Sequence, residues 1–226
     1  GGVDGLRSEA KPFRVHRHQA GDVNSISEDR IAGLAFDRAG RLWAATVNGL
    51  NCFDGKRCTR YLHQPDDPGS LPSDDLSTVA TAPNGDVWTG TNYGGLYRFD
   101  QQRFHSYPTS SSSLPMPNGW QSSTGFQINS ILPDDHGGIW IGARAYGIDY
   151  LQGDRFRHYN PQDAQPGVSA QPTTNAVFGF LAHDDTVWFA TETSGLVRFD
   201  PRTERFTAFQ APSEHPDMPQ SFHCIV

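Results

Sequence analysis

The stretch LSTVATAPNGDVWTGTNYGGLYRFD (residues 76–100) decides the fold, because the same pattern returns three more times along the chain. The other copies begin at Ile31, Ile128 and Ala176. Each copy carries a tryptophan, and successive tryptophans are 45, 52 and 48 residues apart, at Trp43, Trp88, Trp140 and Trp188. Four copies at this period predict a fold built from repeated structural units.

Turn residues divide each copy into four short strands. An apolar run precedes a turn rich in Asp and Gly, the tryptophan strand follows, a glycine with Leu or Ile opens the third strand, and an aromatic pair or its remnant marks the fourth. The position two residues after each tryptophan is small, which would let a neighbouring sheet approach closely: Ala45, Gly90, Gly142 and Ala190. The glycines that open the third strands are expected to supply a special backbone angle: Gly49, Gly95, Gly147 and Gly195. The pattern predicts an all-β fold, a β-propeller with four-stranded antiparallel blades.

The whole chain, residues 1–226, is interpreted as one propeller domain. We expect four complete blades over residues 31–61, 76–107, 128–159 and 176–209, part of a preceding blade in 1–20, and the start of a following blade in 222–226. The chain begins with Gly1 rather than Met, and both ends fall inside expected blades. We therefore expect a fragment of a larger ring of about seven blades, with a closed five-bladed ring as the alternative.

Composition and motifs exclude several classes of protein. A net charge of −7 does not suit a nucleic-acid-binding face, which needs to be basic. No apolar stretch approaches the ~20 residues of a membrane-spanning helix, so a membrane contact would come only through segments outside this sequence. The nine histidines form no metal-binding motif, and no nucleophile or cofactor motif occurs. We expect no metal, no cofactor and no enzyme activity in this segment.

The repeat resembles a known family, the two-component regulator propeller repeat. In that family a hydrophobic-Trp-hydrophobic-Gly-Thr strand is followed by Gly-Leu-x-Arg-Phe-Asp, and residues 87–91 (VWTGT) and 95–100 (GLYRFD) match it almost position for position. The connection YLHQPDDPGSLPSDDL (residues 61–76) is also similar, whereas the third copy departs at Ala143 and Ile148. The resemblance implies the sensor region of a bacterial hybrid histidine kinase or diguanylate cyclase, on the periplasmic or extracellular side of the inner membrane. Any kinase or cyclase activity would belong to segments outside this sequence.

Candidate ligand-binding residues gather on one face of the predicted fold. Strand direction alternates in each sheet, so the connections between blades and the turns between second and third strands emerge together, and these connections are the long segments. Binding groups are commonly carried by long loops on a rigid scaffold. The candidates are Trp120, Asn118 and Gln121 in the longest connection, and Asn48, Asn92, Tyr93, Arg144, Tyr146, Glu192 and Thr193 in the turns. They predict a small polar ligand such as an oligosaccharide, with Trp120 as either a stacking platform or an anchor for its loop.

Two other functions remain open at this point. Streptogramin lyases look similar blade by blade, but a lyase needs a catalytic histidine near the axis, and His223 is only a weak candidate. The second alternative is a protein-interaction scaffold, and a propeller–propeller dimer is a possible partner arrangement.

Two cysteines flank one of the hairpin turns. Cys52 and Cys58 lie on either side of Asp54-Gly55. With a three-residue loop they would face each other across the hairpin, close enough for a disulfide in an oxidising compartment. Their aligned positions, Arg98 and Phe104, show that both sites have other uses, so reduced thiols are the alternative.

Overall fold

The computed structural model describes residues 15–93, 95–107, 127–144, 147–159, 176–192 and 195–209. Within these ranges all sixteen regular elements are β-strands. No helix in the described part of the chain is long and apolar enough to cross a bilayer.

The strands form four separate sheets, each a four-stranded antiparallel meander in chain order. The first sheet contains β1 (Ile31–Phe36), β2 (Leu42–Thr46), β3 (Gly49–Phe53) and β4 (Cys58–Tyr61). The second contains β5 (Leu76–Thr81), β6 (Val87–Thr91), β7 (Leu96–Phe99) and β8 (Phe104–Tyr107). The third contains β9 (Ile128–Pro133), β10 (Gly138–Ala143), β11 (Gly147–Gln152) and β12 (Arg155–Tyr159). The fourth contains β13 (Val177–His183), β14 (Thr186–Thr191), β15 (Leu196–Asp200) and β16 (Arg205–Phe209).

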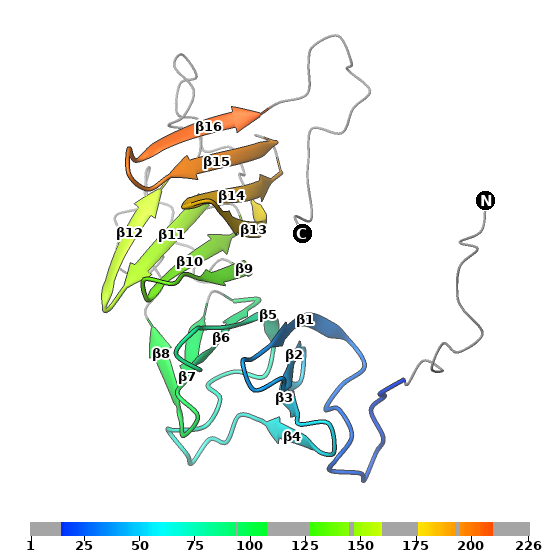
Figure 1. Cartoon of the computed structure of the whole chain (residues 1–226). Helices are drawn as coiled ribbons and strands as arrows, with labels where there is room; N and C mark the ends of the chain where they lie inside the picture. Colours follow the sequence, from blue (N-terminus) through cyan, green and yellow to red (C-terminus); the bar gives the residue numbers. More distant parts are fainter. Residues whose placement is uncertain are drawn as a thin grey trace, which may run out of the picture.

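The four sheets follow one another around an open arc (Figure 1). Their first strands, β1, β5, β9 and β13, pack against one another along the inner side. The fourth strands lie at the outer edge of each sheet, farthest from these inner strands in the order of the meander. This arrangement is that of propeller blades around an axis, as the sequence predicts. The residues expected in partial blades lie largely outside the described ranges, and residues 15–20 form no strand.

The core consists of three apolar clusters, one between each pair of neighbouring sheets. Trp43, Trp88 and Trp140 are 0%, 5% and 3% exposed, because each is covered by the following sheet. The residue two positions after each of these tryptophans must be small, because the following sheet comes close to the strand there. A Cβ on Gly90 would lie 2.6 Å from the side chain of Ile128 in the third sheet. The expectation that small residues here permit close sheet packing is confirmed.

The glycines of the third strands are only partly as predicted. Gly49, Gly147 and Gly195 have positive φ angles of 99°, 86° and 71°, which other residues rarely adopt. Gly95 does not have a positive φ, so that expectation is wrong for the second sheet. There, a Cβ would collide with the Tyr97 hydroxyl, and the absence of a side chain is needed for space.

The connections that enter the first and second sheets, residues 16–30 and 62–75, are themselves repeated in structure. In each, a histidine backbone N–H donates to an aspartate carboxylate, in the pairs His18–Asp29 (2.7 Å) and His63–Asp74 (2.6 Å). In each, a serine hydroxyl accepts from a glutamine N–H, in the pairs Gln19–Ser25 (2.9 Å) and Gln64–Ser70 (3.0 Å). Both place an apolar residue in the interior, Ile26 and Leu71. These two connections therefore share one hydrogen-bonded structure, and their sequence is part of the repeat.

The predicted approach of Cys52 and Cys58 is wrong. In the β3–β4 hairpin Cys52 is opposite Thr59, and Cys58 is opposite Phe53. Successive residues of a strand point to opposite faces, so the two thiols lie on opposite sides of the sheet. Both are free and buried, and burial raises the pKa of Cys58 to about 11 and also raises the pKa of Cys52.

We predict that Trp140→Ala destabilises the protein by about 3–5 kcal/mol, because it removes a buried indole between two sheets. Trp188→Ala is the matched control, since Trp188 occupies the same position in the fourth sheet but is only half-buried. Its loss should cost clearly less. The free energies of unfolding are measured by urea denaturation, and equal losses for the two variants would contradict the assigned packing.

Both buried cysteines should be unreactive in the folded protein. In a Cys224→Ser background, a thiol reagent at about pH 8 should modify neither Cys52 nor Cys58, because burial blocks access and shifts thiolate formation to higher pH. Unfolding without a reductant should release two reactive thiols. If none appear, the cysteines are joined by a disulfide and the register of the hairpin is wrong.

Candidate functional site

In the described part of the chain, one face of the arc carries the connection 62–75, the residues just before the third and fourth sheets, and the starts of the turns between second and third strands. Backbone hydrogen bonds tie these segments together: Gly49 N–H donates to Asp74 O (2.8 Å), Asn92 to Asp75 O (3.3 Å), Arg144 to Gln127 O (2.8 Å) and Glu192 to Ala176 O (3.0 Å). We call this the loop face, and the opposite side, with the other two turns of each sheet, the turn face.

The first residue after the second strand has the same backbone environment in three sheets. Asn92, Arg144 and Glu192 each donate their N–H to the carbonyl of the residue just before the first strand of their own sheet. Their side chains are an amide, a cation and an anion. A constant backbone frame thus presents three different chemical groups on the loop face.

A second constant position lies on the inner strands. In all four sheets the pairing between first and second strands is irregular at one residue, so an extra residue is inserted: Ala32, Ser77, Asn129 and Phe178. Such a bulge breaks the alternation of the strand and re-aims a side chain. The same backbone irregularity therefore carries four different side chains.

Members of both sets meet in one cavity, which we call the inner cavity. It has a volume of about 430 Å³ and is lined by the bulge residues Ser77, Asn129 and Phe178, the turn residues Arg144 and Glu192, and Gln127. Three sheets contribute to it. The inner cavity is therefore formed only when the blades assemble around the arc.

The inner cavity contains polar groups that the described residues do not satisfy. The Nδ2 atom of Asn129 is buried and has no hydrogen-bond partner there. Leaving such a donor unsatisfied costs about 1–3 kcal/mol. The atom has almost no accessible surface, so a ligand would reach it only after the side chain turned toward the cavity. Arg144 and Glu192 are exposed and belong to none of the ion pairs among the described residues. The lining of the inner cavity thus carries two exposed charges of opposite sign and the side-chain amide of Asn129.

The predicted site residues divide into three groups. Arg144 and Glu192 line the inner cavity. Asn48, Asn92 and Tyr93 lie in turns of the loop face but do not line the cavity, and the amide of Asn92 already donates to Asp75 (2.7 Å). The remaining candidates lie outside the described residues: Asn118, Trp120, Gln121, Tyr146 and Thr193.

Sequence reasoning missed four lining residues: Ser77, Gln127, Asn129 and Phe178. Three of them share one structural position, the second residue of the inner strands β5, β9 and β13. Ordinary alternation would not distinguish this position from its neighbours. The available signal was that its chemistry changes from copy to copy, while the residue before it stays apolar.

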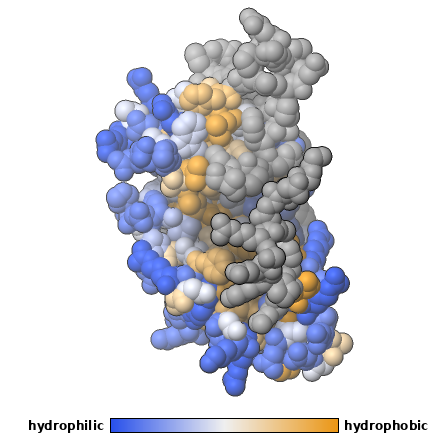
Figure 2. Space-filling view, turned by 45° about the vertical axis from the view of Figure 1, so that its right-hand side comes forward, coloured by the Kyte–Doolittle hydropathy of each residue, from blue (hydrophilic) through white to orange (hydrophobic). Residues whose placement is uncertain are grey.

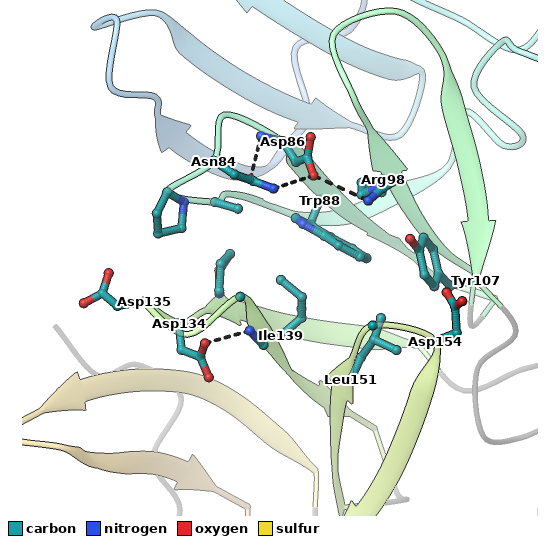
Figure 3. Close-up of a pocket in the computed structure, with 16 residues that line it drawn as sticks. Asn84, Asp86, Trp88, Arg98, Tyr107, Asp134, Asp135, Ile139, Leu151 and Asp154 are labelled. Carbon is teal, nitrogen blue, oxygen red and sulfur yellow. Dashed lines mark hydrogen bonds and ion pairs between the residues drawn. The ribbon is translucent and has the colours of Figure 1, made fainter.

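The turn face contains two further hollows, which the sequence did not predict. One of about 360 Å³ lies between the second and third sheets, where Trp88, Arg98 and Tyr107 face Ile139 and Leu151 (Figure 3). Another of about 1090 Å³ lies between the third and fourth sheets. Both are wedges where neighbouring sheets diverge.

The charged groups of these wedges are largely paired within the protein. Asp86 accepts from Asn84 (2.8 Å) and approaches Arg98 (3.6 Å). Arg157 donates two hydrogen bonds to Glu204, both 2.7 Å long. The Nε atom of Arg98 is nevertheless buried without a hydrogen-bond partner among the described residues, as is the amide nitrogen of Asn129 in the inner cavity. The two wedges differ from the inner cavity in that most of their charged groups are already paired.

Two histidines lie at turns of the turn face. His136 and His183 are exposed, and His183 lies 3.1 Å from the Asp184 carboxylate. The described ranges contain no group of three or more His, Cys, Asp or Glu side chains placed to hold a metal ion.

Solved structures share this fold. The structure described as the extracellular domain of the hybrid two-component system BT3049 from B. thetaiotaomicron matches with a TM-score of 0.55 at 19% identity, covering 91% of this chain and 31% of that one. The corresponding domain of BT4673 from the same organism gives 0.60 at 18% identity, covering 85% and 23%. BamB from Moraxella catarrhalis gives 0.52 at 20% identity, covering 80% and 50%.

These similarities establish the class of protein, a β-propeller. No known protein family and no curated protein matches the sequence. The chain spans less than a third of the length of the two extracellular domains, at 31% and 23%.

Proposed function

We propose that this chain is the ligand-sensing propeller region of a membrane-anchored signal-transduction receptor, and that its inner cavity binds a small polar ligand such as an oligosaccharide. The observation that carries the proposal is the inner cavity itself. In this cavity, equivalent backbone positions of successive sheets carry different side chains, and the amide nitrogen of Asn129 is buried without a hydrogen-bond partner.

The fold comparisons support the receptor part of this proposal. Two of the similar structures are extracellular domains of hybrid two-component systems. A sensor of that kind would place this propeller on the periplasmic or extracellular side of the membrane. The output activity would then belong to other segments of the receptor, and the role of this segment would be binding.

The chemistry of the inner cavity suits a ligand rich in hydroxyl groups. Asn129 and Arg144 are hydrogen-bond donors, the Glu192 carboxylate is an acceptor, and the amide of Gln127 can be both. A sugar hydroxyl donates one hydrogen bond and accepts others, so it can use all of these groups. Phe178 adds an apolar surface to the same cavity.

The lining of the inner cavity favours binding over catalysis. None of its six residues is a histidine, and the two charged groups are exposed rather than held against a partner base or acid. His223, on which a lyase would depend, lies outside the described residues.

The binding proposal is tested with a panel of neutral and charged oligosaccharides, screened by thermal shift and followed by calorimetry on those that stabilise the protein. For such a ligand, Arg144→Ala and Glu192→Ala should each weaken binding roughly 10-fold or more, because hydrogen bonds to charged groups contribute about 1.5–3 kcal/mol. Circular dichroism should show unchanged folding, since both side chains are exposed.

Arg202→Ala is the matched control for this experiment. Arg202 is an exposed arginine on the turn face, and its side chain is 78% exposed. Its loss should leave the affinity unchanged. The proposal fails if the variants at Arg144 and Glu192 bind as tightly as the original protein, or if Arg202→Ala weakens binding as much as they do.

A further inference from the structure

The inner strands of the four sheets carry almost no charge. Strands β1, β5, β9 and β13 contain no Asp, Glu, Lys or Arg. Figure 2 brings forward the right-hand side of Figure 1, which carries these first strands, and shows apolar surface (orange) between hydrophilic rims (blue). Charge therefore reaches the inner cavity from the turns, where Arg144 and Glu192 are the two charged residues among the six that line it.

Arg144 and Glu192 occupy equivalent positions of neighbouring sheets, and only their backbones take part in the scaffold. Their N–H groups bond to the carbonyls of Gln127 (2.8 Å) and Ala176 (3.0 Å). The equivalent Asn92 uses its side chain as well, donating to Asp75 (2.7 Å). The side chains of Arg144 and Glu192 instead line one cavity without forming an ion pair with each other. The repeated frame thus places two opposite charges around one space without neutralising them.

Two opposite charges around one cavity discriminate between ligands by charge. A simple anion is attracted by Arg144 and repelled by Glu192, and a simple cation experiences the reverse. A neutral hydroxyl can bond to either group, but hydrogen bonds between two charged groups are shorter and stronger. A ligand that carries both a carboxylate and an ammonium group pairs with both residues and meets no like charge that it cannot avoid by its orientation.

Building on the ligand-binding role proposed above, we propose that the ligand of the inner cavity is a small zwitterion. Its carboxylate pairs with the Arg144 guanidinium, whose planar fork suits two parallel hydrogen bonds, and its ammonium group pairs with the Glu192 carboxylate. The volume of about 430 Å³ suits a small molecule, and Phe178 offers an apolar surface to the body of the ligand. Sugar acids with a free amino group have this chemistry, and so do amino acids and short peptides.

The charge requirement is tested by calorimetry on the full chain with four related monosaccharides. Muramic acid carries both an ammonium and a carboxylate group, glucuronic acid only the carboxylate, glucosamine only the ammonium group, and glucose neither. Muramic acid should bind roughly 10-fold or more tightly than each of the other three, because a second charge-assisted pair is added. The dipeptide alanyl-alanine distinguishes the two sources of a zwitterion: tighter binding than muramic acid identifies a peptide-like ligand, and weaker binding identifies a sugar.

Charge reversal at the two positions provides a sharper test. Glu192→Arg surrounds the inner cavity with two cations, so this variant should prefer glucuronic acid over muramic acid. Arg144→Glu leaves two carboxylates and should prefer glucosamine. Arg202→Glu is the matched control, since it makes the same charge change at an exposed arginine of the turn face, and it should keep the original order of affinities. Circular dichroism checks that each variant is folded.

The outcomes separate this proposal from the binding role on which it rests. If glucose or a neutral oligosaccharide binds as tightly as both zwitterions, the charge requirement is wrong and the binding role of the inner cavity stands. Reversal variants that keep the original order of affinities also overturn the charge requirement. If none of these probes and none of the oligosaccharides of the wider panel binds, both proposals fail.

Discussion

The structure depends on an indole packed between two sheets. Trp43, Trp88 and Trp140 are buried between neighbouring sheets. The small residue two positions later lets the inner strand of the next sheet approach, as Ile128 does at Gly90 and Val177 at Gly142. A four-stranded sheet cannot bury both of its faces alone, so each blade is stable only against its neighbours. Sheet-to-sheet packing therefore determines the arc, and the arc determines which loops come together.

The same repetition explains how a site can arise without special local structure. Inner-strand bulges and backbone hydrogen bonds to the second turn recur from sheet to sheet, so the positions of their side chains are set by the scaffold. Chemistry at these positions is then free to differ between copies without a change in packing. The ligand-binding role proposed for the inner cavity depends on this combination of a recurring backbone and variable side chains.

Much of the fold could be predicted because its signals are local. Turn residues, the tryptophan and the small residue after it are close in sequence, and together they define each sheet. Predictions failed where a single residue of register mattered. The pairing of Cys52 with Thr59 instead of Cys58 reverses the face of one thiol, and Gly95 serves steric space instead of a left-handed backbone.

The sequence by itself determined that four similar antiparallel sheets form, and that Arg144 and Glu192 lie on the face shared by loops and turns, because strand order and alternating direction follow from the repeat. Only the tertiary structure decided that Ser77, Asn129 and Phe178 join them in one cavity. The reason is physical: the bulge that re-aims these side chains has no residue signature, and residues from three sheets meet only after the sheets pack around the arc.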